Sequence, residues 1–293
     1  MTVLKQGGEG LFLDGTLGGG GHAHALLTAC ANCRVLGVDK DPRALDRARV
    51  RLEEFGTRIR FRQGSFHLAV EDPEVRKEGL AGALLDLGVS SHQLDDDSRG
   101  FTIRPGAPLD MRMGEEGATA MEYLAEVSER SLIRDLTRGD APKPRPLARS
   151  VVRRRQSRPL KTSDDLVGAL EAALRRPATH AEKARTFQAV RIAVNGELDA
   201  LGDALPAIRE ALRPGGVLVV LSYHSGEDAG VKKAFRDWSD PGWGIPAKVP
   251  LRADETAALG DTLTRRPVVA SDRETELNPR ARPARLRAWR KAS

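Results

Sequence analysis

The sequence predicts an α/β protein with a mostly parallel β-sheet, helices on both faces of the sheet, and an inserted small all-helical domain. Short apolar runs, several of which end in a carboxylate, alternate with helical patterns. A glycine-rich loop follows the first run. Roughly 105–185 contains no strand candidate, so the alternation stops there and resumes later. The 293 residues suffice for one large domain with an insert.

The first strand and loop indicate a cofactor site. The apolar run 10–14 ends in Asp14 and meets five glycines within seven residues, Gly15 and Gly18 to Gly21, before the helical pattern 22–30. Glycine permits both a positive φ and close approach of the backbone to a ligand. This strand–loop–helix order predicts a nucleoside-containing cofactor. The alternative is a glycine-rich turn that binds nothing.

The second strand supports this interpretation. The run 34–38 ends in Asp39, an acid about 20 residues after the loop, where it can accept hydrogen bonds from ribose hydroxyls. The pattern Gly18-x-Gly20-x-x-Ala23 also matches the dinucleotide fingerprint, which is a weak signal alone. Asp14 argues against a pyrophosphate, because two negative groups repel. It suits the cationic amino-acid end of S-adenosylmethionine.

The remaining elements continue the sheet. The fourth strand ends in Asp86, and strand carboxyl ends line the ligand crevice, so Asp14, Asp39 and Asp86 are expected to converge. A Pro-Gly-Gly turn at 214–216 precedes the fifth strand, as in S-adenosylmethionine-dependent methyltransferases. The predicted helices are 41–55, 66–78, 184–212 and 226–238, and the predicted strands are 59–62, 82–87, 217–221, 261–265 and 283–289, with a Gly/Pro-rich loop at 239–261.

The insert is predicted to contain helices at 118–138, 147–156 and 163–175. The net charge is +6, and cations are concentrated in two stretches without acids, eight in 141–163 and six in 280–291. One such stretch is often a solvated face, but two favour a polyanion such as a phosphate backbone.

Composition indicates a cytoplasmic protein without a membrane partner. No apolar run approaches the ~20 residues needed to span a bilayer, and no signal-peptide pattern begins the chain. The two cysteines, Cys30 and Cys33, form one Cys-x-x-Cys without a second pair for zinc. We expect them to be structural thiols, and no metal site is expected.

A set of motifs covering nearly the whole chain resembles the RsmH (MraW) family of bacterial 16S rRNA cytosine-N4 methyltransferases. The motifs lie at 14–22, 85–95, 99–101, 108–113, 185–195, 223–225 and 278–282. The resemblance implies a Rossmann-like S-adenosylmethionine-binding domain over 1–104 and 186–293. It also implies a helical, RNA-recognising domain over 105–185. The implied acceptor is a cytidine in the decoding region of 16S rRNA, within the small ribosomal subunit. A homodimer is left open.

The resemblance also implies cofactor contacts. They fall on Gly20, Gly21, His22, Asp39, Phe66, Asp86 and Gln93, to which the loop pattern adds Asp14 and Gly18. Glycine amides can face the methionine carboxylate, Asp39 the ribose, and Phe66 the adenine face.

The catalytic hypothesis centres on the turn after the fourth strand. The exocyclic amine of cytosine is a poor nucleophile because its lone pair is delocalised, so acceptors aimed at its protons assist the reaction. We expect Asp86 or the carbonyls of 86–91 to do this, with Ser90 and Ser91 assisting. His224 is a candidate for shaping the acceptor pocket, although a strand-end histidine satisfied by backbone is equally compatible.

The candidate RNA contacts are arginines of both basic stretches and of the helix between them. For Arg185 and Arg191, ion pairs with acids such as Glu182 or Asp199 are the alternative. The full set is Arg153, Arg154, Arg155, Arg185, Arg191, Arg280 and Arg282.

Three rival functions remain: an S-adenosylmethionine enzyme acting on a small amine or on DNA, a non-catalytic RNA-binding protein, and a nicotinamide-dependent oxidoreductase. The basic stretches argue against a small substrate. The intact loop and acids argue against a protein without catalysis.

Overall fold

The structure is a computed structural model that describes residues 2–240, 242 and 257–293. It divides into a sheet unit, Met1–Gly88 with Asp199–Ser293, and a helical unit, Val89–Leu198. The helical unit is longer at both ends than the expected 105–185. The reason is packing: Phe101 and Val190 lie in the same apolar core as the insert helices.

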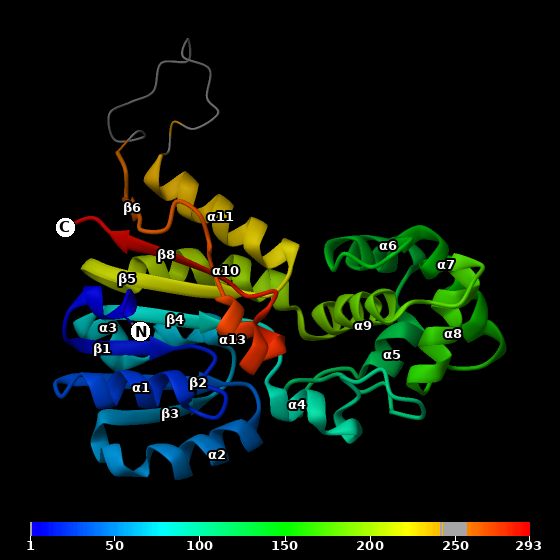
Figure 1. Ribbon diagram of the computed structural model, residues 1–293, viewed down its shortest axis with the longest axis horizontal. Coiled ribbons are helices and arrows are strands. Elements are labelled where there is room, and N and C mark those ends of the chain that lie inside the picture. Colours follow the sequence, from blue (N-terminus) through cyan, green and yellow to red (C-terminus); the bar gives the residue numbers. More distant parts are fainter. Residues whose placement is uncertain (1, 241, 243–256) are drawn as a thin grey trace. The chain divides into compact units, whose positions relative to one another are not determined.

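The sheet unit contains one mixed β-sheet in the strand order β3-β2-β1-β4-β5-β8-β6, with β7 paired to β8 (Figure 1). Strands β1 to β5 are parallel, β8 runs antiparallel to β5, and β6 and β7 run antiparallel to β8. The strands are β1 (Gly10–Asp14), β2 (Cys33–Asp39), β3 (Ile59–Gln63), β4 (Leu80–Asp86), β5 (Leu212–Ser222), β6 (Gly260–Thr262), β7 (Val268–Val269) and β8 (Arg285–Lys291).

Helices cover both faces of this sheet. Successive strand residues point to opposite faces, so Leu11 and Leu13 pack with α3, α10 and α11, whereas Phe12 packs with η1, α1 and α2. The elements are η1 (Leu4–Gly7), α1 (Gly21–Ala29), α2 (Pro42–Leu52), η2 (Glu53–Arg58), η3 (Phe66–Glu71), α3 (Pro73–Glu78), α10 (Glu197–Ala211), α11 (Ser225–Ser239), α13 (Asp272–Leu277) and η5 (Pro279–Ala281).

The helical unit has its own apolar core, to which Leu124, Leu147, Leu166 and Phe187 contribute. Within residues 89–198, all of which the structure describes, the only strand-like pairing is an isolated bridge between Pro108 and Thr162. The helices are α4 (Ser91–Asp95), η4 (Asp97–Arg99), α5 (Ala120–Glu126), α6 (Glu129–Arg138), α7 (Pro144–Ser157), α8 (Ser163–Leu174) and α9 (His180–Asn195).

Two long predicted helices are each divided in two. The expected helix 184–212 is α9 and α10, because Gly196 ends α9 with φ 60°. The expected helix 118–138 is α5 and α6, because Ser128 caps α6 by accepting the Ser131 N–H. Strand β7 was not predicted, and most of the loop expected at 239–261 lies outside the described residues.

The cysteine prediction is wrong. Cys30 and Cys33 form a disulfide in the turn between α1 and β2, where their Cα atoms lie 5.4 Å apart, within the range such a bond requires. The sequence analysis also expected no membrane-spanning segment and no metal site, and the structure bears on these points for the described residues only. No helix among them is long and apolar enough to cross a membrane, and no cluster of three or more potential metal ligands occurs among them.

Candidate cofactor site

Three carboxylates lie at one edge of the sheet. Asp14, Asp39 and Asp86 are the last residues of β1, β2 and β4, which are neighbours in the parallel part of the sheet. The loop after β1 is fixed to β4 because the Asp86 N–H donates to the Thr16 hydroxyl oxygen (2.6 Å). The structure therefore brings together the acids that the sequence predicted to converge.

Asp14 is the most unusual of these groups. It is only 3% exposed, and neither of its carboxylate oxygens has a hydrogen-bond partner among the described residues. Burial, together with the negative charges of Asp86 and Asp39, raises its pKa to about 7, and the nearby backbone N–H groups of Thr16 and Ala23, which do not reach hydrogen-bond geometry, oppose this rise. A buried carboxyl group without a partner is costly, so this position favours a cationic ligand group.

The glycine loop presents backbone rather than side chains. Gly20, at φ 77°, caps the first turn of α1, and a Cβ there would lie 2.9 Å from a methyl group of Leu52. Gly18, at φ 53°, donates its N–H to Asp39, and Gly21 begins the helix. The unpaired amides at the start of α1 form a positive end that suits a carboxylate.

Asp39 holds this loop in place. One carboxylate oxygen accepts the Gly18 N–H (2.8 Å) and the other accepts the Asp41 N–H (2.9 Å). Burial raises the pKa of Asp39. Each oxygen retains a further acceptor position, so the group can bind hydroxyls while it orders the loop.

Asp86 is oriented by a residue that the sequence analysis missed. The Tyr223 hydroxyl donates to Asp86 Oδ1 (2.8 Å), while His22 Nδ1 lies 3.7 Å from Asp86 Oδ2. Burial raises the pKa of Asp86, and His22 and Tyr223 oppose that effect. The position of Tyr223 immediately after β5 was the available signal, because β5 is the neighbour of β4.

Phe66 lies beside the loop. It begins η3 and is half-buried, and its Cβ lies 2.9 Å from the point where a Cβ on Gly15 would be. The same hypothetical atom would lie 2.6 Å from a methyl group of Leu85, so glycine is required at position 15.

His224 occupies a structural position. Its Nδ1 accepts the N–H groups of Gly226 (3.1 Å) and Glu227 (3.4 Å), so the ring caps α11. Its Nε2 lies 3.2 Å from the Glu227 carboxylate, and both side chains are buried. The backbone therefore engages Nδ1, while Nε2 makes no hydrogen bond to the described residues. That His224 shapes an acceptor pocket stays a prediction.

Ser90 and Gln93 form a capping box at α4 in the helical unit. Ser90 Oγ accepts the Gln93 N–H (3.3 Å), and Gln93 Oε1 accepts the Ser90 N–H (2.9 Å). These contacts hold the helix end, while the Ser90 O–H remains available as a donor, so its assisting role stays a prediction. Ser91 is exposed at the first position of α4.

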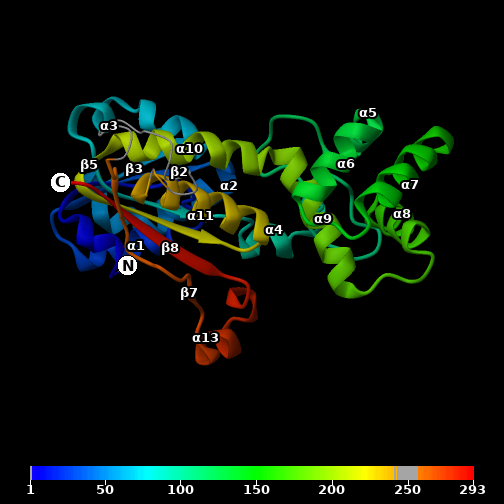
Figure 2. The ribbon, with the colours of Figure 1, turned by 90° about the horizontal axis from the view of Figure 1, so that it is seen from above.

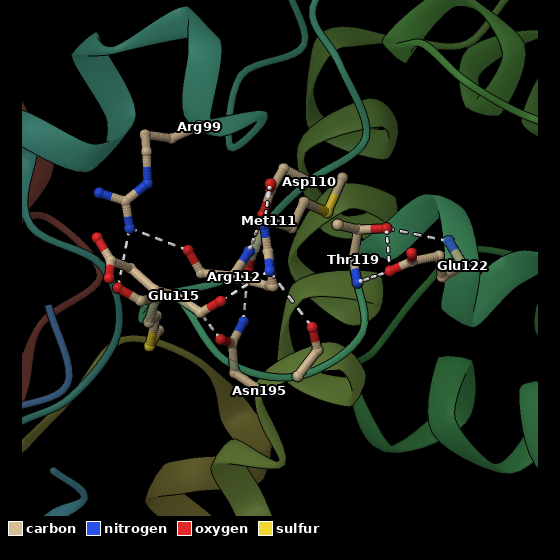
Figure 3. A network of polar contacts seen from close by, with 10 residues as sticks. Arg99, Asp110, Met111, Arg112, Glu115, Thr119, Glu122 and Asn195 are labelled. Atoms are coloured by element: carbon tan, nitrogen blue, oxygen red, sulfur yellow. Dashed lines mark hydrogen bonds and ion pairs between the residues drawn. The ribbon is translucent and has the colours of Figure 1, made fainter.

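A polar network organises the start of the helical unit (Figure 3). Arg112 pairs with both carboxylate oxygens of Asp110 (2.9 and 2.8 Å). Asn195 brackets the same turn, because its Nδ2 donates to Met111 O (2.7 Å) and its Oδ1 accepts the Met113 N–H (2.8 Å). These contacts fix Met111, which is fully buried at φ 60°. Asp110 therefore has a structural role.

Two of the arginines expected to bind RNA make contacts that support the helical unit. Arg154 donates to the Gly168 carbonyl (2.7 Å), and Arg155 donates to the carbonyls of Leu124 (2.9 Å) and Val127 (2.7 Å). Because their N–H groups satisfy helix backbone, their guanidinium groups are only partly available to a phosphate.

The remaining predicted arginines differ in exposure. Arg191 makes a two-point ion pair with Glu197 (2.8 and 2.9 Å) and is only 12% exposed, so its expected role in RNA contact is corrected to a structural one. Arg185 lies 3.7 Å from Asp140, with about half of each side chain exposed. Arg153 is exposed on α7, and in the sheet unit Arg280 and Arg282 are exposed as well.

The fold and the site define a class. A parallel sheet with a glycine loop after β1, an acid at the end of β2, and helices on both faces is the arrangement of a Rossmann-like methyltransferase. The chain matches the MraW methylase family over residues 1–292. The chain belongs to this family and is a methyltransferase.

Curated relatives agree with this assignment. The chain is 50% identical over 286 residues to "Ribosomal RNA small subunit methyltransferase H" of Gemmatimonas aurantiaca, covering 96% of this chain and 89% of the relative. It is 43% identical over 300 residues to the protein of the same name from Heliobacterium mobile, covering 99% and 96%.

Proposed function

We propose that this enzyme transfers a methyl group from S-adenosylmethionine to the exocyclic N4 amine of a cytidine in the decoding region of 16S rRNA. The observation that carries the proposal is the buried, unpartnered Asp14 beside the glycine loop of a MraW family member. The names of the curated relatives support small-subunit rRNA as the acceptor. The proposed setting is the small ribosomal subunit in the cytoplasm.

The residues at the sheet edge fit the proposed cofactor. Asp14 lacks a partner, and the ammonium group of the methionine end would supply one. The amide of Gly21 suits the methionine carboxylate, whereas the Gly20 N–H already donates to the Leu17 carbonyl (2.8 Å), so that Gly20 would contribute through the close approach of its backbone. Asp39 retains acceptor positions for the ribose hydroxyls, and Phe66 offers an apolar face for adenine.

When bound, S-adenosylmethionine supplies an electrophilic methyl group, so the protein chiefly positions donor and acceptor. Asp86 is the group we assign to the acceptor amine, because Tyr223 occupies only Oδ1. Its carboxylate can accept a hydrogen bond from the amine and promote pyramidalisation at nitrogen. The family resemblance also assigns Gln93 to the cofactor. The proposal keeps this assignment, although Gln93 Oε1 accepts the Ser90 N–H at the start of α4.

The helical unit is proposed to take part in RNA recognition. Arg153 on α7 is exposed and has no polar partner among the described residues, and Arg145 and Arg149 share its helix face at spacings of four. Arg149 also lies 3.4 Å from Glu129. Cations in a row on one helix suit successive phosphates of a polyanion.

A methyl-transfer assay tests the proposal. Purified protein with tritiated S-adenosylmethionine is offered 16S rRNA, 30S subunits and duplex DNA, and the product nucleosides are identified by mass spectrometry. We expect N4-methylated cytidine from the rRNA or from the 30S subunits, and no labelled product from the DNA. Label in DNA, or in a nucleoside other than cytidine, contradicts the proposal.

A variant tests the assigned role of Asp86. Asp86→Ala should lower turnover by more than about tenfold, roughly 1.4 kcal/mol of transition-state stabilisation. A smaller loss of turnover with unchanged cofactor affinity would show that Asp86 does not assist the acceptor amine. A rise in melting temperature with NADH, but not with adenosylhomocysteine, would favour the oxidoreductase alternative.

A further inference from the structure

The segment between β6 and β8, residues 263–284, forms a projecting strap that carries β7, α13 and η5. Figure 2 shows β7 and α13 extending away from the sheet near the start of β8. The strap contains five arginines and three acids. Val268, Val269 and Leu277 on it are 54%, 61% and 80% exposed. Exposed apolar side chains beside cations indicate a surface that contacts another molecule.

The strap lies at the same edge of the sheet as the cofactor site. The strand register places Asp86 opposite Leu221, Leu221 opposite Leu286, and Leu286 opposite Val268. These residues form one row across β4, β5, β8 and β7, so β7 is three strand spacings, about 15 Å, from Asp86. Glu274 of α13 also contributes to the raised pKa of Tyr223, after burial, Asp86 and Glu227.

The free cations near this edge are on the strap rather than on β8. Arg287 is buried and pairs with Asp228 (2.7 and 3.0 Å), and Arg285 lies 3.4 Å from the same carboxylate. At the opposite end of β8, Lys291 donates to backbone carbonyls. By contrast, among the described residues no hydrogen-bond or ion-pair partner is found for the exposed side chains of Arg265, Arg266, Arg273 and Arg282.

We propose that the strap is an RNA-binding surface of the sheet unit, at which Arg265, Arg266, Arg273 and Arg282 hold the phosphates of the strand that carries the acceptor base. This inference rests on the proposed function and deepens it. Positive charge on the strap complements a phosphate backbone, whereas the adjacent edge, with its three carboxylates, does not. A polyanion approaching Asp86 therefore needs such cations.

The test compares two double variants that each remove two positive charges. R265Q/R266Q alters the strap. R76Q/K77Q is the control, because Arg76 and Lys77 are exposed on α3, just before β4 and so at the opposite edge of the sheet. The probe is a 16S rRNA fragment containing the decoding region, and its affinity is measured over a range of salt concentrations.

We expect the strap variant to bind the fragment about tenfold less tightly and to lose about 1.4 from the slope of log K against log salt, about 0.7 for each lost contact to single-stranded RNA. The control should match the parent protein, and both variants should bind adenosylhomocysteine as the parent does. R273Q/R282Q should reproduce the effect from the far end of the strap.

Two outcomes overturn the inference while leaving the proposed function intact. In the first, the parent methylates the RNA but the strap variant has the slope and affinity of the control. In the second, sedimentation shows that the parent is a dimer that the strap substitutions dissociate, so the strap contacts a second copy. If the parent neither binds nor methylates the RNA, the proposed function fails, and the strap inference fails with it.

Discussion

Asp14→Asn tests the electrostatics of the cofactor site directly. The pKa of Asp14 is about 7 in the folded protein against an ordinary value of 3.8. Between these pH values the folded protein holds a proton that the unfolded chain has lost. Stability from this group is therefore fully present below about pH 4 and is lost as pH rises through 7. The pKa difference of about 3 corresponds to about 4 kcal/mol, as an upper order of magnitude.

Asparagine is neutral at every pH, so the variant should lack this decline. Its buried amide lacks partners, as the protonated carboxyl group of the parent does, so the two proteins should have similar stability below about pH 4. We therefore expect the stability of the variant to exceed that of the parent by an amount that grows as pH rises and is largest above about pH 8. Urea unfolding followed by tryptophan fluorescence measures this, since Trp238 and Trp289 lie in the core of the sheet unit.

The same titration should appear in ligand binding. Adenosylhomocysteine carries the ammonium group proposed to pair with ionised Asp14. Its affinity should rise about tenfold per pH unit below pH 7 and level off above it, with proton release measured by calorimetry in buffers of different ionisation enthalpy. Asp14→Asn should bind weakly without this dependence. Parallel stability curves for the two proteins, together with pH-independent binding by the parent, would refute the reasoning.

Three further substitutions have defined expectations. Tyr223→Phe removes the 2.8 Å hydrogen bond that favours ionised Asp86, so the acidic limb of the rate–pH profile should move to higher pH while the melting temperature is retained. Gly15→Ala places a Cβ 2.6 Å from a methyl group of β4 and should lower the unfolding free energy in urea by about 1–3 kcal/mol. Arg287→Met leaves buried Asp228 without its two-point partner and should cost about 3 kcal/mol without altering the salt slope of RNA binding.

The parallel sheet was predictable because its strands are short apolar runs separated by helices and turns. Helix boundaries were harder to predict, because a single turn can end a helix while the apolar periodicity of the sequence continues. Gly196 was a readable stop signal, but Ser128 resembles any exposed serine until its capping contact is seen. Strand β7 has two exposed residues and exists through pairing with β8, so no local pattern marks it.

Site residues could be predicted from the sequence where they lie at strand ends. They could not be predicted where their role depends on hydrogen-bond partners distant in the sequence. Asp14 and Asp86 follow apolar runs, and topology alone brings such positions together. The Tyr223–Asp86 bond joins residues 137 apart in sequence. Similarly, whether Ser90 and His224 cap helices or face a ligand depends on hydrogen bonds that residue identity does not specify.

Whether an arginine of these stretches can bind a polyanion depends on its ion pairs and hydrogen bonds in the folded protein, and the sequence does not specify these. In 280–291 the dense run of cations lies mostly on β8, where buried Arg287 and its neighbours bind Asp228 and backbone carbonyls. The strap has fewer cations per residue, yet Arg265 and Arg266 remain exposed. Under the proposed function, a cationic cofactor and an anionic RNA must approach the same edge of the sheet. Carboxylates at the strand ends with arginines on an adjacent strap satisfy both requirements, because the cofactor and the RNA each meet groups of opposite charge at this edge.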